Sequence, residues 1–147
     1  MKKILLSAAF ALAANWASAQ DIVTYTTDEP YEDVIFGLEN AILDQGLVVD
    51  SVSHVGDMLE RTKADVGSDV TVFLNAETYS FCSAHLSRKV MEVNPMNIVY
   101  CPYDIFVARL PANPDQTIIG FRDYPEGEMK EVQALLDTIA KLAIGLE

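Results

Sequence analysis

Two cysteines and one histidine are the side chains of this sequence whose types and spacing could support chemistry. Cys82 is followed three positions later by His85, and Cys101 is the second cysteine of the 147 residues. If a helix begins here, this spacing places Cys82 and His85 on one side of its first turn. With Cys101 as a third ligand, these side chains would suit copper or zinc.

The cysteines have two other interpretations, and the sequence leaves all three open. In an oxidising compartment, Cys82 and Cys101 could form a structural or redox-active disulfide. As small apolar side chains, they could instead be buried as unreactive thiols. At a helix N-terminus, the helix dipole would favour the thiolate of Cys82.

The segment between the cysteines is long enough to leave one end of the domain and return to it, which could bring Cys82 and Cys101 to the same height. A helix over residues 83–93 descends about 15 Å, and a strand over residues 97–101 climbs back about 13 Å. A disulfide also requires Cα atoms within about 7 Å of each other, which these lengths alone do not establish.

Motifs of the common enzyme classes are absent from the sequence. It contains no Gly-x-Ser-x-Gly, no glycine-rich phosphate loop, no His-Glu-x-x-His and no Cys-x-x-Cys-His. His54 has no partner evident in the sequence, so we expect a structural role for it. We expect the acidic cluster near the mature N-terminus to be a solvated surface, with a calcium site as the alternative. That cluster consists of Asp21, Asp28, Glu29, Glu32 and Asp33.

The N-terminus has the pattern of a cleaved secretory signal. Lys2 and Lys3 form a short basic start, residues 4–14 are an apolar run, and residues 17–19 read Ala-Ser-Ala. This small-x-small pattern predicts cleavage between Ala19 and Gln20. The apolar run is shorter than the ~20 residues that a membrane-spanning helix needs, so we expect no membrane anchor after cleavage.

The export signal and the acidic charge limit the kinds of partner that we expect the mature chain, residues 20–147, to bind. The signal is typical of the bacterial periplasm, with full secretion as the alternative. The whole chain has a net charge of −12, from 22 acidic and 10 basic side chains, and loss of Lys2 and Lys3 makes it −14. Such a charge repels nucleic-acid phosphates and anionic lipids, so neither is an expected partner.

Hydrophobic periodicity predicts one domain over residues 20–147. Strand patterns cover residues 21–26, 47–55, 76–81, 97–110 and 117–122. Helical patterns cover residues 31–45, 57–66, 83–93 and a C-terminal stretch from about residue 128. Residues 67–75 are expected to be a connection, and residues 111–116 a long hairpin turn.

The predicted element order, β-α-β-α-β-α-β-β-α, indicates an α+β fold. The terminal hairpin and the short strands argue against a doubly wound parallel sheet. We expect a sandwich of one mixed or antiparallel sheet with its helices mainly on one face. Pro102 within the longest predicted strand implies that this strand lies at an edge or carries a bulge.

Two stretches resemble the domain of unknown function 302 family. Residues 75–83 read Asn-Ala-Glu-Thr-Tyr-Ser-Phe-Cys-Ser, and residues 94–107 contain Asn-Pro and then Asn-Ile-Val-Tyr-Cys-Pro-Tyr. The opening also fits, with Tyr25 and Thr26 on a strand and a helix that begins Tyr-Glu-Asp at Tyr31. The resemblance spans nearly the whole mature chain.

The resemblance implies a small α+β fold that is often dimeric and has no established activity or catalytic residues. The positions of Cys82 and Cys101 match the cysteine-containing branch of that family. Some members are exported, which agrees with the N-terminal signal.

We also expect the mature domain to be a homodimer. An edge strand offers unpaired backbone groups, and Ile98, Tyr100 and Phe106 would add apolar area on its second face. The charge of −14 opposes association, but burial of apolar area over a standard interface can outweigh this diffuse repulsion.

The sequence therefore predicts an exported, non-enzymatic α+β module that binds a small ligand or a protein partner. The alternative is a redox or metal-handling protein that uses Cys82 and Cys101.

Export is tested by the N-terminus of the mature protein. We expect N-terminal sequencing of protein recovered from the exported fraction to begin at Gln20, because signal peptidase cleaves after the small-x-small pattern. Membrane-bound protein that retains Met1 would show that the segment is an anchor instead.

Overall fold

The computed structural model describes residues 22–146. The predicted signal, residues 1–19, and the cleavage junction at Ala19 and Gln20 lie outside this range. Among the residues described, no helix combines the length and the hydrophobicity needed to cross a membrane.

One antiparallel sheet of five strands forms the centre of the protein, in the order β1-β5-β4-β3-β2. This confirms the predicted α+β class, and it resolves the choice between a mixed and an antiparallel sheet. The strands are β1 (Ile22–Thr27), β2 (Val49–Ser53), β3 (Asn75–Phe81), β4 (Tyr103–Leu110) and β5 (Asn113–Arg122). The α-helices are α1 (Tyr31–Asp44), α2 (Val55–Thr62), α3 (Ala84–Val93) and α4 (Met129–Ala143), and the 3-10 helix η1 is Pro95–Tyr100.

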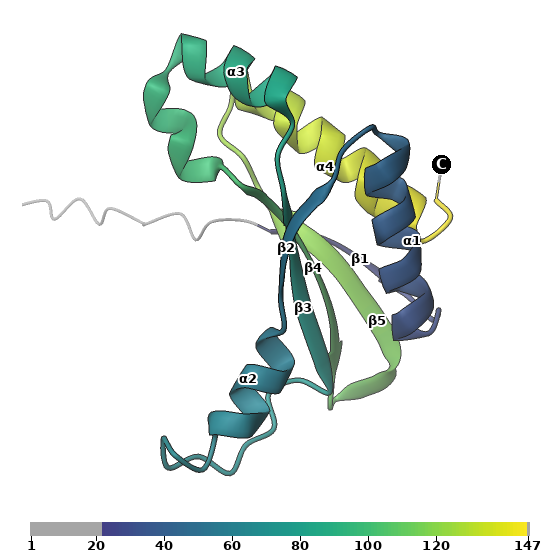
Figure 1. Ribbon diagram of the computed structural model, residues 1–147. Helices are drawn as coiled ribbons and strands as arrows, with labels where there is room; N and C mark the ends of the chain where they lie inside the picture. The colour runs from purple at the N-terminus through teal and green to yellow at the C-terminus, as the bar shows by residue number, and fades with distance from the viewer. Residues whose placement is uncertain (1–21, 147) are drawn as a thin grey trace, which may run out of the picture.

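The helices α1 and α4 cover one face of the sheet, while α3 and α2 stand at its opposite ends (Figure 1). Alternate strand residues point toward α1 and α4 because side chains alternate across a strand. Phe81, Ile105, Val107, Ile119 and Phe121 are all fully or almost fully buried. The predicted apolar stripes of the two helices pack against them, so the core lies between this face and the helix pair.

A glycine allows the two covering helices to touch. A Cβ atom at Gly37 of α1 would lie 2.2 Å from the backbone oxygen of Ala143 in α4. No side chain can occupy that space, so the backbones of α1 and α4 are in direct contact at this point.

The prediction of one strand over residues 97–110 is wrong for residues 97–102, because β4 begins at Tyr103. Asn94 caps η1, where its Oδ1 accepts a hydrogen bond from the backbone N–H of Met96 at 3.0 Å. Pro95 then occupies the first helical position, which suits a residue without an N–H. Pro102 precedes β4, so the sheet loses no hydrogen bond to it. The strand β4 lies between β3 and β5, and the predicted edge position is therefore also wrong.

The predicted long hairpin turn is also shorter than expected. Strand β5 begins at Asn113, which pairs with Leu110, so only residues 111–112 form the turn.

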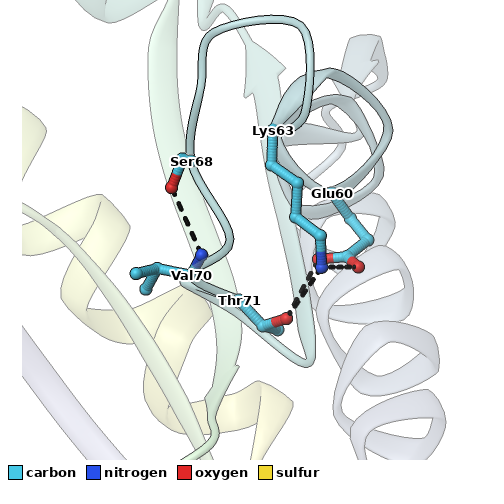
Figure 2. Close-up of polar contacts among 5 residues, drawn as sticks. All are labelled: Glu60, Lys63, Ser68, Val70 and Thr71. Atoms are coloured by element: carbon cyan, nitrogen blue, oxygen red, sulfur yellow. Dashed lines mark hydrogen bonds and ion pairs between the residues drawn. The ribbon is translucent and has the colours of Figure 1, made fainter.

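The segment after α2 is a connection, as predicted, and polar contacts hold it against the helix (Figure 2). The Lys63 ammonium group donates a hydrogen bond to Glu60 and one to the Thr71 hydroxyl at 3.3 Å. Thr71 in turn donates to the second carboxylate oxygen of Glu60 at 3.2 Å. The Val70 N–H donates to the Ser68 hydroxyl at 3.2 Å, which turns the chain back toward β3.

Candidate functional site

Cys82 lies between the end of β3 and the start of α3. The strand ends at Phe81, which is fully buried, and this anchors the backbone just before the cysteine. Ser83 is the N-cap of α3, because its hydroxyl accepts a hydrogen bond from the Leu86 N–H at 3.3 Å. Cys82 therefore stands one residue before the helix cap, outside the helix.

Cys101 lies between η1 and β4. Its backbone N–H donates to the Ile98 carbonyl at 3.1 Å and so closes the 3-10 helix. The peptide bond between Cys101 and Pro102 is cis, and β4 begins at Tyr103.

The register between β3 and β4 brings the two cysteines together. Phe81 pairs with Tyr103, so Cys82 follows one strand and Cys101 precedes the other at the same end of the sheet. Their Sγ atoms are 2.8 Å apart. Both are free thiols in the structure, and both are half-buried. The two sulfur atoms are in direct contact at a place that solvent still reaches.

A pair of hydroxyl groups lies next to Cys101. The Ser87 Oγ of α3 is 4.0 Å from the Cys101 Sγ, and it is 2.8 Å from the Tyr103 hydroxyl oxygen. Tyr103 is almost fully buried, and burial raises the pKa of its phenol although the hydrogen bond with Ser87 lowers it. The Ser87 hydroxyl thus lies between the buried Tyr103 phenol and the Cys101 sulfur.

The expected activation of Cys82 by the helix dipole is wrong. Burial, together with the adjacent Cys101 sulfur and the negative charge of Asp50, raises the pKa of the Cys82 thiol to about 12. The Tyr103 N–H opposes this shift only in part. Cys82 precedes the capping residue, and its partial burial makes the thiolate costly.

The three-ligand metal set is not formed. His85 is exposed on α3, and across residues 22–146 no three His, Cys, Asp or Glu side chains lie close enough to hold a metal ion. The predicted spacing assumed that Cys82 and His85 share a helical turn, but Cys82 lies before the helix. The structure thus brings the two cysteines together and leaves His85 out of a copper or zinc site.

His54 has a partner that the sequence does not reveal. Its Nδ1 lies 2.6 Å from a carboxylate oxygen of Glu77, and the Tyr79 hydroxyl donates to the other oxygen at 2.9 Å. The residues are 23 positions apart and meet because β2 and β3 pair with Ser53 opposite Thr78. This contact joins the start of α2 to β3, which agrees with a structural role for His54.

The raised pKa of Cys82 predicts slow and strongly pH-dependent alkylation of this thiol. In the reduced native protein at pH 8, we expect iodoacetamide to modify Cys82 at least ~100-fold more slowly than in the unfolded chain, because the thiolate is the reacting form. The rate should keep rising above pH 9.5, where an ordinary thiol has reached its plateau. Peptide mapping by mass spectrometry separates the two cysteines, and equal rates in folded and unfolded protein would contradict the assignment.

Comparison with known proteins identifies the fold. No protein-family model matches the chain, and no curated protein matches it. One solved structure that it resembles is the uncharacterized conserved protein DUF302 from Bacillus stearothermophilus, with a TM-score of 0.59 and 18% sequence identity. The match covers 85% of this chain and 91% of that chain. The protein therefore has the fold of a DUF302 protein, as the resemblance of residues 75–83 and 94–107 implied.

Proposed function

We propose that this protein is an exported thiol–disulfide protein of the cysteine-containing DUF302 type, in which Cys82 and Cys101 form a reversible intramolecular disulfide. The observation that carries the proposal is the 2.8 Å contact between the two sulfur atoms. Two half-buried thiols in contact need little backbone movement to become a disulfide, and external thiols can still reach them.

The predicted export signal supports the same function. A periplasmic or secreted protein meets oxidants, and two adjacent thiols in that environment are converted to a disulfide. In the reaction with an external disulfide, one protein thiolate displaces an external thiolate and forms a mixed disulfide. The second protein cysteine then displaces the other external thiolate, so that the protein loses two electrons and two protons and the external disulfide becomes two thiols.

The redox couple is tested by thiol counting and by equilibration. We expect protein from the exported fraction to lack titratable thiols, and to show two after treatment with reductant. The disulfide closes a loop of about 20 residues and should stabilise the folded protein by ~3 kcal/mol. Chemical unfolding with and without reductant measures this difference.

Two single variants serve as controls for the redox couple. Cys82→Ser and Cys101→Ser should each show one free thiol, and reductant should leave their stability unchanged. Two titratable thiols in wild-type protein purified under oxidising conditions, and none lost on addition of oxidised glutathione, would contradict the proposal.

A second candidate function, a binding module that self-associates, has support from the uncovered face of the sheet. We call this the open face, and it points away from α1 and α4. By strand register it consists of Ile22, Thr24, Thr26, Ile118, Gly120, Arg122, Asp104, Phe106, Ala108, Ala76, Thr78, Ser80, Ser51 and Ser53. The small side chains of Ala76, Ser80 and Ala108 on this face are buried between larger neighbours. A Cβ atom at Gly120 would lie 2.9 Å from the Phe106 ring, so this ring lies directly over the glycine.

Charge favours a second copy of the chain as the occupant of the open face. Asp104 and Arg122 are its ionisable residues, and they pair with each other at 3.7 Å. The helix side is strongly acidic by contrast, since α1 alone carries four exposed acids, Glu32, Asp33, Glu39 and Asp44. Two copies repel one another least when their open faces meet.

The size of the open face fits such a contact. Five strands spaced ~4.8 Å apart, with about six residues each, give a projected face of roughly 500 Å². The accessible area of a face with side chains exceeds its projection, which brings it near the ~800 Å² that each partner buries in a standard interface. Pro102 and an edge position of β4 play no part in this contact, because β4 lies inside the sheet. Of the three apolar residues predicted at the interface, the open face retains only Phe106.

The dimer is tested by charge substitution on each side of the sheet. We expect the mature wild-type protein to be a dimer at tens of micromolar, and Ile22→Glu/Thr24→Glu to weaken the dimer at least ~10-fold by placing four carboxylates in the interface. The control Phe36→Glu/Leu43→Glu, at exposed sites of α1, should leave the dimer unchanged. Light scattering gives the mass, and a monomeric wild type would contradict the prediction.

A further inference from the structure

Four exposed aliphatic side chains belong to the segment that leads from the end of α3 through η1. This segment lies at the end of the sheet opposite α2 (Figure 1). We call them the α3–η1 patch. They are Val93, Met96, Ile98 and Val99, and each is between 58% and 67% exposed. Contiguous apolar side chains on the surface of a soluble domain commonly mark a binding surface. Ile98 and Val99 fall within the predicted strand of residues 97–110, but the cap at Asn94 turns residues 95–100 into η1, outside the sheet.

A hollow of about 420 Å³ adjoins this patch. One wall comes from η1, with Met96, Val99 and Tyr100, and the other comes from Pro125, Glu126 and Glu128 before α4. The Tyr100 ring packs against the Tyr124 ring with their centroids 5.5 Å apart. An apolar side chain that enters the hollow therefore meets an aromatic wall that is already held in place.

One residue that lines the hollow is the chain neighbour of Cys101. Tyr100 lines the hollow and is the residue before Cys101, which is itself half-buried. A polypeptide segment seated in the hollow would thus have a neighbouring residue within reach of the Cys101 sulfur. The Cys82 Sγ contacts the Cys101 Sγ at 2.8 Å.

Charge determines which kind of segment fits. Glu126 and Glu128 stand on the wall of the hollow, and the chain as a whole has a net charge of −12. Lys130 pairs with Glu126 at 3.5 Å, but the Glu126 side chain remains 93% exposed. A segment that combines apolar side chains with lysine or arginine is attracted to this site, and an acidic segment is repelled.

We infer that the α3–η1 patch and its hollow bind an apolar, basic polypeptide segment and present a cysteine of that segment to Cys101. This inference rests on the proposed thiol–disulfide function and names its substrate class. The Cys101 thiolate attacks the disulfide sulfur of the bound segment, forms a mixed disulfide and releases the other sulfur as a thiolate. Cys82 then attacks the Cys101 sulfur, its proton passes to the departing peptide thiolate, and the Cys82–Cys101 disulfide remains.

The test compares a peptide substrate with a small one. The peptide carries leucine, phenylalanine and lysine around one cysteine, which is held as a mixed disulfide with 2-nitro-5-thiobenzoate. Reaction with reduced protein releases the coloured thiolate, which is followed by absorbance. Oxidised glutathione is the small substrate, because it needs only the two cysteines. A second peptide, with glutamate in place of lysine, tests the charge argument.

The variants are chosen so that only the surface changes. Ile98→Glu/Val99→Glu places charge on the α3–η1 patch, and Val70→Glu is the matched control at the opposite end of the sheet. Val70 is 62% exposed, close to the 67% of Val99, and its side chain points away from the contacts of that loop (Figure 2). Circular dichroism and thermal unfolding confirm that each variant is folded.

The results separate the docking surface from the redox couple. We expect Ile98→Glu/Val99→Glu to lower the rate with the lysine peptide at least ~10-fold while its rate with oxidised glutathione and the Val70→Glu rates stay unchanged. We also expect the lysine peptide to react faster than the glutamate peptide, with a difference that shrinks as salt is added. Equal peptide rates in all three proteins would overturn the docking surface and leave the redox couple intact. No reaction of the wild type with either substrate would overturn the redox function itself.

Discussion

The antiparallel pairing of β3 with β4 is the constraint on which the rest of this protein depends. Seven residue pairs, from Asn75 opposite Arg109 to Phe81 opposite Tyr103, hold these two strands in one register at the centre of the sheet. That register buries Phe81 and Tyr103 on the same face and leaves Phe106 on the other. It also brings the ends of two loops to one place, where Cys82 and Cys101 meet. The candidate site is thus a consequence of strand register rather than of a sequence motif.

The same sheet has two very different faces. One is closed by α1 and α4, whose backbones touch at Gly37 and Ala143. The other presents Phe106 over Gly120 and a single ion pair, Asp104 with Arg122. The acidic side chains that give the chain its charge include four exposed acids on α1, so the open face is a nearly neutral area of an acidic molecule. The α3–η1 patch forms a second apolar area at the cysteine end, separate from the open face.

Local patterns predicted most elements, and they failed where a short-range capping interaction was stronger. The apolar stripes of α1 and α4 and the alternation in β3 follow directly from burial of one side of each element. Val99, Cys101 and Tyr103 continue the alternation of β4, which predicted a strand from residue 97. The Asn94 cap and Pro95 instead begin a 3-10 helix, which removes Val99 from the core and exposes it. Leu142 and Leu146 continue the apolar pattern of the C-terminal stretch, but the end of α4 leaves both about half-exposed.

The sequence by itself determined the fold class, the acidic charge and the two cysteines as the residues of interest, because these depend on composition and on neighbours within a few positions. The export signal is likewise predicted from residues that are close together in the sequence. Only the tertiary structure decided that Cys82 and Cys101 touch, that His54 pairs with Glu77 and that His85 remains apart. These contacts join residues 19 and 23 positions apart, and the pairing of β3 with β4 and with β2 creates them. The raised pKa of Cys82 also depends on tertiary structure, because burial and the contact with Cys101 outweigh the dipole of the helix that follows.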